Sequence, residues 1–423
     1  DGILQVGTAA YVLFSPQQQP DAGAIALVLA ITLLPFSIIG PFVSFTLDHF
    51  NRRQVAVTTD IIRVLIALML GILVLNPDLR DHWTIWLFYG GVLLAMSFNR
   101  YLLAGLSAAL PHTVDKDEYL IASSVMPTIG PAGVLVGAGI ATGIRFGAST
   151  RMETYQADAL IFTAAAIGFA VTVGLALTIP ARALGPDREE AQAPKPRPSD
   201  ILRGLVNAVT HLRERTPAAI GLTTIGAQRI VYGMTQVATI LLFRNWFHEV
   251  EQIESAMADI ALWAGATAAG FVVSAVIVPP LARRLGVRRA IVVLLLGAGV
   301  LQIVPGSIFT LPTLVAAGFG LGLGSQALKI CVDTLVQAHV DGNFKGRVFT
   351  IYDMIFNACF VAAACLVALI FPADGHTLTG FVALGGLLIA IGIVFWARTR
   401  TIGSAEFDRG TQFDPSAEPA RTH

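Results

Sequence analysis

Charged side chains are scarce in this 423-residue chain, which has 28 Lys and Arg residues and 28 Asp and Glu residues. They make up 13% of the sequence, about half the share found in soluble globular proteins, while hydrophobic residues make up 55%. The formal net charge of zero provides no overall field that would attract nucleic acid or an acidic partner. The composition therefore predicts a protein of the lipid bilayer that does not bind nucleic acid.

Cysteine is also scarce, and its placement argues against a metal or redox site. Cys331, Cys359 and Cys365 all lie in apolar runs, and no two of them have the spacing of a zinc or redox motif. No grouping of nucleophile and base occurs, and no polar stretch is long enough to form a soluble catalytic domain. We therefore expect no metal, no cofactor and no enzymatic activity.

Long apolar runs, separated by polar or Pro/Gly breaks, fill most of the sequence. A membrane-spanning helix needs about 20 predominantly apolar residues. The first run is shorter than this, so we expect the chain to begin inside a helix. Twelve candidate spans lie near residues 1–15, 22–47, 54–76, 83–110, 118–146, 158–179, 217–245, 254–280, 288–309, 311–338, 345–371 and 377–399.

The longest polar stretch, residues 180–216, separates the sixth span from the seventh. Its first part is rich in Pro and charge, as linkers are. In its second part Ile201, Leu205 and Leu212 share a helical face, which predicts an amphipathic helix at the membrane surface. We therefore expect an N-terminal six-helix bundle at 1–179, a cytoplasmic linker at 180–216, a C-terminal six-helix bundle at 217–400 and a cytoplasmic tail at 401–423.

The distribution of Lys and Arg predicts the orientation. Basic residues are retained in cytoplasmic loops, and most of those between spans share one side when successive loops alternate. The exceptions, which would face outward, are Arg80, Arg145, Arg151 and Arg244. Arginine far outnumbers lysine, which hints at a GC-rich bacterial source. We expect a multi-pass protein of the bacterial inner (plasma) membrane with both termini cytoplasmic.

The stretch "GPFVSFTLDHFNRR", residues 40–53, ends an apolar run abruptly in charge. A plain positive-inside loop explains Arg52 and Arg53 but not Gly40 or Asp48. A second basic hairpin, "VPPLARRLGVRR" at 278–289, lies at the corresponding place in the second half of the chain.

The two hairpins align at a constant sequence offset. Arg288 then stands where Arg53 stands in the first copy, and Arg283 stands opposite Asp48. The match of Arg53 with Arg288 is the part of this alignment that carries weight.

Twelve spans, a central loop and paired basic hairpins resemble the major facilitator superfamily (MFS). The signature hairpin of that family reads G-x-L-A-D-[RK]-x-G-[RK]-[RK], often after a G-P pair. Asn51 replaces the second glycine, and because Asn tolerates a left-handed backbone, a tight turn remains possible. The residues that match the signature are Gly40, Pro41, Asp48, Arg52 and Arg53.

Two further stretches are similar to the drug- and siderophore-exporter branch of the family: "GNFKGRVFTIYD" at 342–353 and "NRYLLAGLSAALP" at 99–111. The resemblance implies an all-α membrane fold of twelve helices in two pseudo-symmetric six-helix bundles. It also implies a gating role for the hairpins, in which Asp48 faces the positive end of helix 11; a topology marker without gating is the alternative. The expected gating residues are Gly40, Asp48, Arg52, Arg53, Arg283 and Arg288.

Ionisable residues inside the spans carry the functional expectations, since each costs on the order of 3 kcal/mol on insertion scales and normally faces a bundle interior or a wet cavity. Lys329 and Asp333 are four residues apart and can pair on one helix face, either structurally or as part of a transport path. Asp60 and Arg63, three apart, are expected to form a structural pair.

Asp1 differs because no basic residue lies within one turn of it on its own helix. With Gln5 on the same face, it is the preferred proton acceptor, held near Arg100 or a cation of another helix. Asp333 and Asp353 are the other proton-coupling candidates.

Polar residues at helical spacing predict the lining of a substrate cavity, although polar contacts between helices would give the same pattern. The candidates are Gln5, Asn99, Arg100, Gln228, Arg229, Tyr232, Gln236, Lys329 and Asn357.

The favoured function is secondary active transport of a small organic or amphipathic molecule by alternating access, with proton-coupled export, by a monomer. A nutrient importer of the same fold is the first alternative. A membrane scaffold or sensor that has lost transport is the second.

Overall fold

The chain is all-helical over the part that the computed structural model describes, and no strand occurs in that part. The described residues are 1–14, 23, 25–27, 29–31, 51–76, 82–109, 113, 133–134, 136–148, 152–180, 183–184, 198–249, 252–304 and 308–409.

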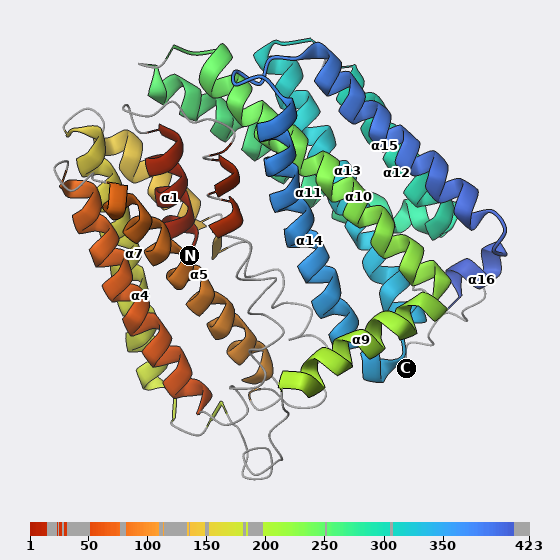
Figure 1. Ribbon diagram of the computed structural model, residues 1–423, viewed down its shortest axis with the longest axis horizontal. Coiled ribbons are helices and arrows are strands. Elements are labelled where there is room, and N and C mark those ends of the chain that lie inside the picture. The colour runs from red at the N-terminus through yellow and green to blue at the C-terminus, as the bar shows by residue number, and fades with distance from the viewer. Residues whose placement is uncertain are drawn as a thin grey trace. The chain divides into compact units, whose positions relative to one another are not determined.

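Two compact units divide the chain (Figure 1). The first takes in the described residues within Asp1–Pro20 and Leu27–Ile201, and the second takes in those within Asp21–Ala26 and Leu202–His423.

The first unit is built around α4, which packs against α5 and α7, while α1 packs against α7. Its helices are α1 (Gly2–Phe14), α4 (Arg52–Leu75), α5 (His82–Ala109) and α7 (Thr154–Thr178). Leu70 of α4 is fully buried, but Leu65 on another face of the helix is 62% exposed. A large apolar side chain on the outer surface is suited to lipid and not to water.

The second unit contains three closely packed helix pairs, α11 with α13, α12 with α15 and α10 with α14. Small residues permit the first of these pairs to approach, because a Cβ atom at Gly322 of α13 would collide with the backbone of Thr267 of α11. The elements are α9 (Pro198–Glu214), α10 (Thr216–Leu241), the π-helical turn η4 (Leu242–Trp246), α11 (Ile253–Leu285), α12 (Val287–Ile303), α13 (Leu311–His339), α14 (Gly342–Ile370), α15 (Leu378–Thr399) and α16 (Ser404–Asp408).

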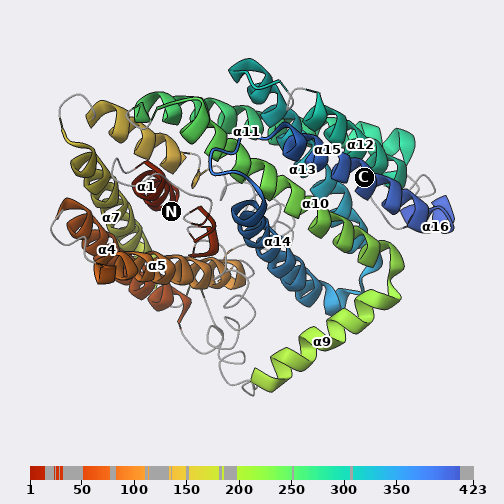
Figure 2. The same cartoon turned by 45° about the horizontal axis from the view of Figure 1, so that its top comes forward.

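Helix α9 lies where the sequence predicts the amphipathic helix, and it crosses one end of α14 in both views (Figure 1 and Figure 2). His211 of α9 stacks on Phe344 with ring centres 4.3 Å apart. A Cβ atom at Gly204 would lie 3.2 Å from Arg347 Nε. These contacts fix α9 against the start of α14.

Seven of the described helices are long and apolar enough to cross a membrane, and α1 is a shorter apolar helix. Helices α10 and α12 also occupy predicted spans. Polar side chains such as Gln228 and Arg229 lower the mean hydropathy of α10, and α12 has only 17 residues. The predicted spans 22–47 and 118–146 fall largely outside the described residues.

The two predicted hairpins differ from their expected geometry. Helix α11 continues through Pro279 and Pro280 to Leu285, so that Gly286, with φ 78°, is the only residue between α11 and α12. Asn51 has φ −57° and not a left-handed backbone; its side chain accepts a 3.0 Å hydrogen bond from the Arg53 N–H and caps α4. The expectation of a left-handed Asn51 is therefore wrong, because helix capping fixes its conformation.

Gly286 also contacts the last described helix. Asp408 Oδ1 of α16 accepts a 3.0 Å hydrogen bond from the N–H of Val287, the first residue of α12. A Cβ atom at Gly286 would lie 2.5 Å from Asp408 Oδ2. The turn therefore requires glycine for its backbone and for its neighbour.

We predict that Gly286→Ala lowers the free energy of unfolding by about 1–3 kcal/mol, since this backbone region is nearly exclusive to glycine. Gly265→Ala is the matched control, because a Cβ atom there meets nothing within 4 Å. Thermal unfolding of the purified protein in detergent measures both variants. Equal melting temperatures for the two would contradict the prediction.

Candidate functional site

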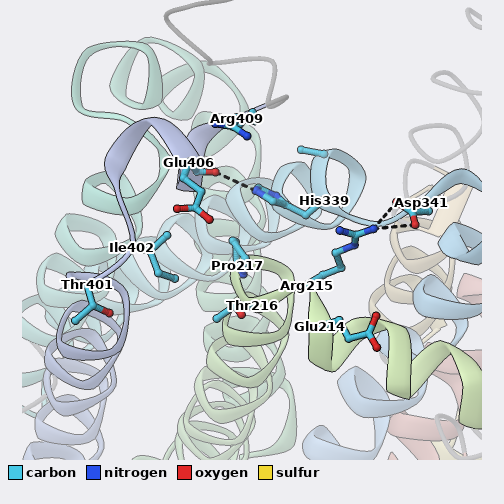
Figure 3. Close-up of a pocket in the computed structure, with 11 residues that line it drawn as sticks. Glu214, Arg215, Thr216, Pro217, His339, Asp341, Thr401, Ile402, Glu406 and Arg409 are labelled. Atoms are coloured by element: carbon cyan, nitrogen blue, oxygen red, sulfur yellow. Dashed lines mark hydrogen bonds and ion pairs between the residues drawn. The ribbon is translucent and has the colours of Figure 1, made fainter.

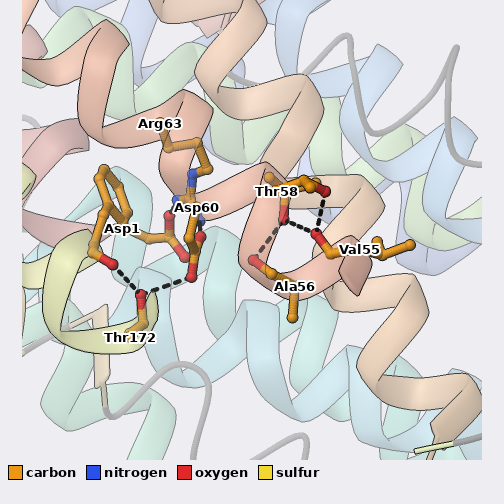
Figure 4. Close-up of polar contacts among 9 residues, drawn as sticks. Asp1, Val55, Ala56, Thr58, Asp60, Arg63 and Thr172 are labelled. Atoms are coloured by element: carbon orange, nitrogen blue, oxygen red, sulfur yellow. Dashed lines mark hydrogen bonds and ion pairs between the residues drawn. The ribbon is translucent and has the colours of Figure 1, made fainter. Parts of the chain in front are cut away.

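A polar cluster within the first unit joins α1, α4 and α7 (Figure 4). Arg63 forms ion pairs with Asp1, directly before α1, and with Asp60 of its own helix, where Arg63 Nη1 lies 2.9 Å from Asp60 Oδ1. Thr172 of α7 donates a 2.6 Å hydrogen bond to Asp60 Oδ2. The guanidinium carbon lies 3.9 Å from the centre of the Phe169 ring. The cluster is thus held together by one central arginine.

Two carboxylates share a single guanidinium in this cluster, so it has one negative charge in excess when all three groups are ionised. The side chains of Arg63 and Asp60 are 2% and 5% exposed, and that of Asp1 is 28% exposed. Uncompensated charge is costly in surroundings of low dielectric constant. The predicted Asp60–Arg63 pair is confirmed, and the cation beside Asp1 is Arg63 rather than Arg100.

Three cavity candidates of the first unit lie where α1 meets α5. Gln5 Nε2 lies 3.9 Å from Met96 Sδ of α5. Asn99, almost one turn further along α5, is 3% exposed, and its Oδ1 atom has no hydrogen-bond partner among the described residues. Arg100 follows it and is half-buried. The structure thus places Gln5 close to the part of α5 that carries the other two candidates.

Arg229 of α10 lies among aromatic rings inside the second unit. Its guanidinium carbon is 3.5 Å from the ring centre of Phe356, 4.5 Å from that of Tyr232 and 5.5 Å from that of Phe360. Its Nη1 atom donates a 3.2 Å hydrogen bond to Ser325 Oγ of α13. Side chains of α10, α13 and α14 therefore meet at this guanidinium.

A second charged group in this unit is the pair of Lys329 and Asp333 on α13. Lys329 Nζ lies 2.6 Å from Asp333 Oδ2, which confirms the predicted local pair. The ammonium lies 5.2 Å from the ring centre of Tyr352 of α14. Each cation of this group thus already has a carboxylate partner.

The remaining polar candidates of the second unit make mostly local contacts. Gln236 Nε2 donates a 2.9 Å hydrogen bond to the Tyr232 hydroxyl, one turn earlier on α10. Gln228 is 3% exposed, and its Oε1 atom has no hydrogen-bond partner among the described residues. Asn357 Nδ2 donates to the backbone oxygen of Asp353 at 2.9 Å. The two predicted stripes therefore include contacts along α10 and along α14.

The first basic hairpin is tied to the end of α7. Arg53 donates to the backbone oxygens of Ala176, at 3.2 Å, and Leu177, at 2.8 Å. Arg52 Nη1 donates to the backbone oxygen of Leu184 at 3.2 Å. Gly40 and Asp48 of the same hairpin lie outside the described residues.

The second basic hairpin is tied to the end of α15 in the same manner. Arg288 Nη1 donates to the backbone oxygens of Thr399, at 3.0 Å, and Ile402, at 2.6 Å, and its Nη2 donates to Ser404 Oγ at 2.7 Å. Arg283, in contrast, is exposed at the end of α11.

The sequence match of Arg53 with Arg288 thus corresponds to a match in contacts. Each arginine follows the start of a helix and binds the carboxyl-terminal end of the helix that closes its own half of the chain. A cation at a helix carboxyl terminus also interacts favourably with the helix dipole.

One buried pair has no counterpart among the candidates from the sequence. Arg145, which the sequence places among the outward-facing basic residues, lies in the helical segment 136–148 and forms an ion pair with Asp158 of α7. The two side chains are 7% and 2% exposed. Opposite charges near the facing ends of consecutive spans were the available signal, because a short connection brings those ends together.

A cavity of about 540 Å³ lies at one end of the second unit (Figure 3). Arg215 Nη2 lies 3.0 Å and 2.9 Å from the two carboxylate oxygens of Asp341, and His339 Nε2 lies 3.5 Å from the backbone oxygen of Glu406. Charges of both signs line the cavity. No group of three His, Cys, Asp or Glu side chains suited to a metal ion occurs among the described residues.

No family model matches the chain. The chain is 29% identical over 395 residues to the uncharacterized MFS-type transporter Rv0037c of Mycobacterium tuberculosis, an alignment that covers 93% of this chain and 86% of the relative. It is 26% identical over 187 residues to the uncharacterized protein Rv0876c of the same species, covering 43% of this chain and 32% of that protein.

Solved transporter structures share the fold. The nucleoside transporter NupG superimposes with a TM-score of 0.66 at 12% identity, over 94% of this chain and 95% of that one. The xylose transporter XylE from E. coli, in an inward open conformation, superimposes with a TM-score of 0.64 at 12% identity, over 96% of each chain.

The fold is therefore the all-helical, multi-span fold of the major facilitator superfamily, and the predicted fold class is confirmed. Together with the mycobacterial relative, it defines a class of membrane transporters and not of enzymes. This chain is an MFS-type secondary transporter, a multi-pass membrane protein.

We predict that Asp158→Ala lowers the free energy of unfolding by about 3–5 kcal/mol, because it leaves the buried Arg145 without its carboxylate. The double variant Arg145→Met, Asp158→Leu removes both charges and is expected to recover most of the loss. Thermal unfolding in detergent, with the yield of monodisperse protein, measures both. A double variant less stable than Asp158→Ala would contradict the interpretation.

Proposed function

We propose that the protein exports a small organic or amphipathic molecule across the bacterial inner membrane in exchange for protons. The transporter acts as a monomer by alternating access, with both termini in the cytoplasm, and takes a single small-molecule substrate class. The distribution of Lys and Arg supports the orientation. The similarity of residues 99–111 and 342–353 to the drug- and siderophore-exporter branch supports the direction.

The observation that carries proton coupling is the unequal charge of the Asp1, Asp60 and Arg63 cluster. A proton is the smallest cation that can neutralise the excess carboxylate, and a carboxylate inside a span is a typical proton relay. Asp1 is the proton acceptor in this proposal, because its side chain is far more exposed than that of Asp60. Asp333 and Asp353 are secondary candidates.

The two basic hairpins are the gating elements of this proposal. Arg53 and Arg288 bind the ends of α7 and α15 through backbone oxygens, so the contacts can break and re-form without leaving a charge in lipid. Arg52, Arg283, Gly40 and Asp48 complete the proposed gate.

Two alternatives use the same fold. A nutrient importer would accumulate its substrate with the proton gradient and not against it. A scaffold or sensor without transport would keep its cellular phenotype when Asp1, Arg229 or Asp353 is replaced by a neutral residue.

The test begins with a thermal-shift screen of the purified protein against drugs, siderophores, sugars and lipids at two pH values. Compounds that stabilise the protein are then tested in proteoliposomes containing the pH-sensitive dye pyranine. Export with proton exchange predicts proton movement opposite to that of the compound. Proton movement in the same direction as the compound would indicate an importer.

We predict that Asp1→Asn abolishes proton movement coupled to the compound but preserves its exchange down a concentration gradient, because the proton acceptor is removed and the binding residues remain. The matched control is Glu254→Gln, which neutralises an exposed carboxylate at the start of α11. Unchanged coupling in Asp1→Asn would exclude this residue as the acceptor.

A further inference from the structure

Arg229 differs from other cations buried in the described spans because no carboxylate contacts it. Arg63 pairs with Asp60 and Asp1, and Lys329 pairs with Asp333. Among the described residues, the polar contact of Arg229 is the neutral Ser325 hydroxyl.

The surroundings of this guanidinium carry no compensating charge. The ionisable side chains that act on it among the described residues are Tyr232, Tyr352 and Cys359, which are all uncharged in their ordinary protonation state at neutral pH. The Nε atom of Arg229 is buried without a hydrogen-bond partner in the described part of the chain. The guanidinium therefore retains unused donor capacity as well as a positive charge.

Aromatic rings determine which part of the guanidinium remains available. The Phe356 ring centre lies 3.5 Å from the guanidinium carbon, and those of Tyr232 and Phe360 lie slightly further away. Rings against the face of a guanidinium leave the N–H groups at its edge free to bind a planar anion. The rings also offer apolar and π surface next to that anion.

The approach of α14 to α10 is built into the sequence. A Cβ atom at Gly226 would lie 3.2 Å from Ile355, and one at Gly233 would lie 2.7 Å from Ala363. These two glycines, on either side of Arg229, hold α14 close enough for its rings to contact the guanidinium. The aromatic wall is thus a feature of backbone packing and does not depend on one side chain.

We propose that Arg229 is an anion-binding subsite, and that the substrate carries a carboxylate attached to an aromatic body. The carboxylate accepts hydrogen bonds from the edge of the guanidinium, and the aromatic body packs against the rings of Tyr232, Phe356 and Phe360. This inference rests on the proposed transport function and specifies its substrate class. Charge-assisted, planar pairing of arginine with carboxylate supplies the specificity.

The test uses cinnamate and its uncharged isostere cinnamamide as probes in a thermal-shift titration of the full chain in detergent. We expect cinnamate to stabilise the wild-type protein and cinnamamide to do so at least about tenfold more weakly, since one charged hydrogen-bonded pair accounts for that factor. Arg229→Gln is expected to abolish the preference for the acid. Arg203→Gln, which removes an exposed arginine of α9, is expected to retain it.

A structural role for Arg229 is separated from binding by the melting temperature without probe. Arg229→Met removes an uncompensated cation, so the proposal predicts an equal or higher melting temperature than wild type, whereas an arginine needed for folding predicts a lower one. Arg229→Lys keeps the charge and is expected to retain part of the acid preference.

Three results would overturn the proposal: equal response to acid and amide, no response to cinnamate, or an acid preference that persists in Arg229→Gln. A melting temperature lowered in Arg229→Met would do so as well. Because the titration uses no proton gradient, its outcome is independent of the coupling test at Asp1. A protein that fails to couple to protons can still show the acid preference, and the reverse also holds.

Discussion

The constraint on which this structure depends is the free-energy cost of charge in the hydrocarbon of a bilayer. Each ionised side chain there costs a few kcal/mol unless it is paired or reaches water. Arg145 and Asp158 meet this constraint by forming a buried pair, and Lys329 and Asp333 meet it within one helical turn. Arg53 and Arg288 meet it by binding backbone oxygens at helix ends. Most of the buried charge is therefore accounted for by ordinary pairing.

Two sites do not balance, and their signs are opposite. The cluster at Arg63 has a carboxylate in excess, whereas Arg229 has no carboxylate among its contacts. Keeping such imbalances lowers stability, so they are expected only where a ligand supplies the missing charge. A proton suits the first site and an organic anion suits the second. This difference separates a coupling site from a substrate site within one fold.

The fold could be predicted from the sequence because long apolar runs and a central polar stretch have few other interpretations in a 423-residue chain. Local pairs such as Asp60 with Arg63 could be predicted from helical spacing. The partner of Asp1 could not, since contacts between helices depend on how the helices rotate. Arg145 was assigned to the wrong environment because a basic residue near a span end resembles a loop residue. Asn51 was misjudged because helix capping, and not turn geometry, fixes its backbone.

The central claim is that the Asp1, Asp60 and Arg63 cluster is kept for transport and not for folding. It is tested most directly by the melting temperature of a variant in which all three charges are removed together, as Asp1→Asn, Asp60→Asn and Arg63→Met. Replacing a complete buried charge group by neutral residues is often neutral or stabilising. The account predicts a melting temperature equal to or above that of the wild-type protein. A clear fall would show that the fold itself requires these charges and would contradict the account.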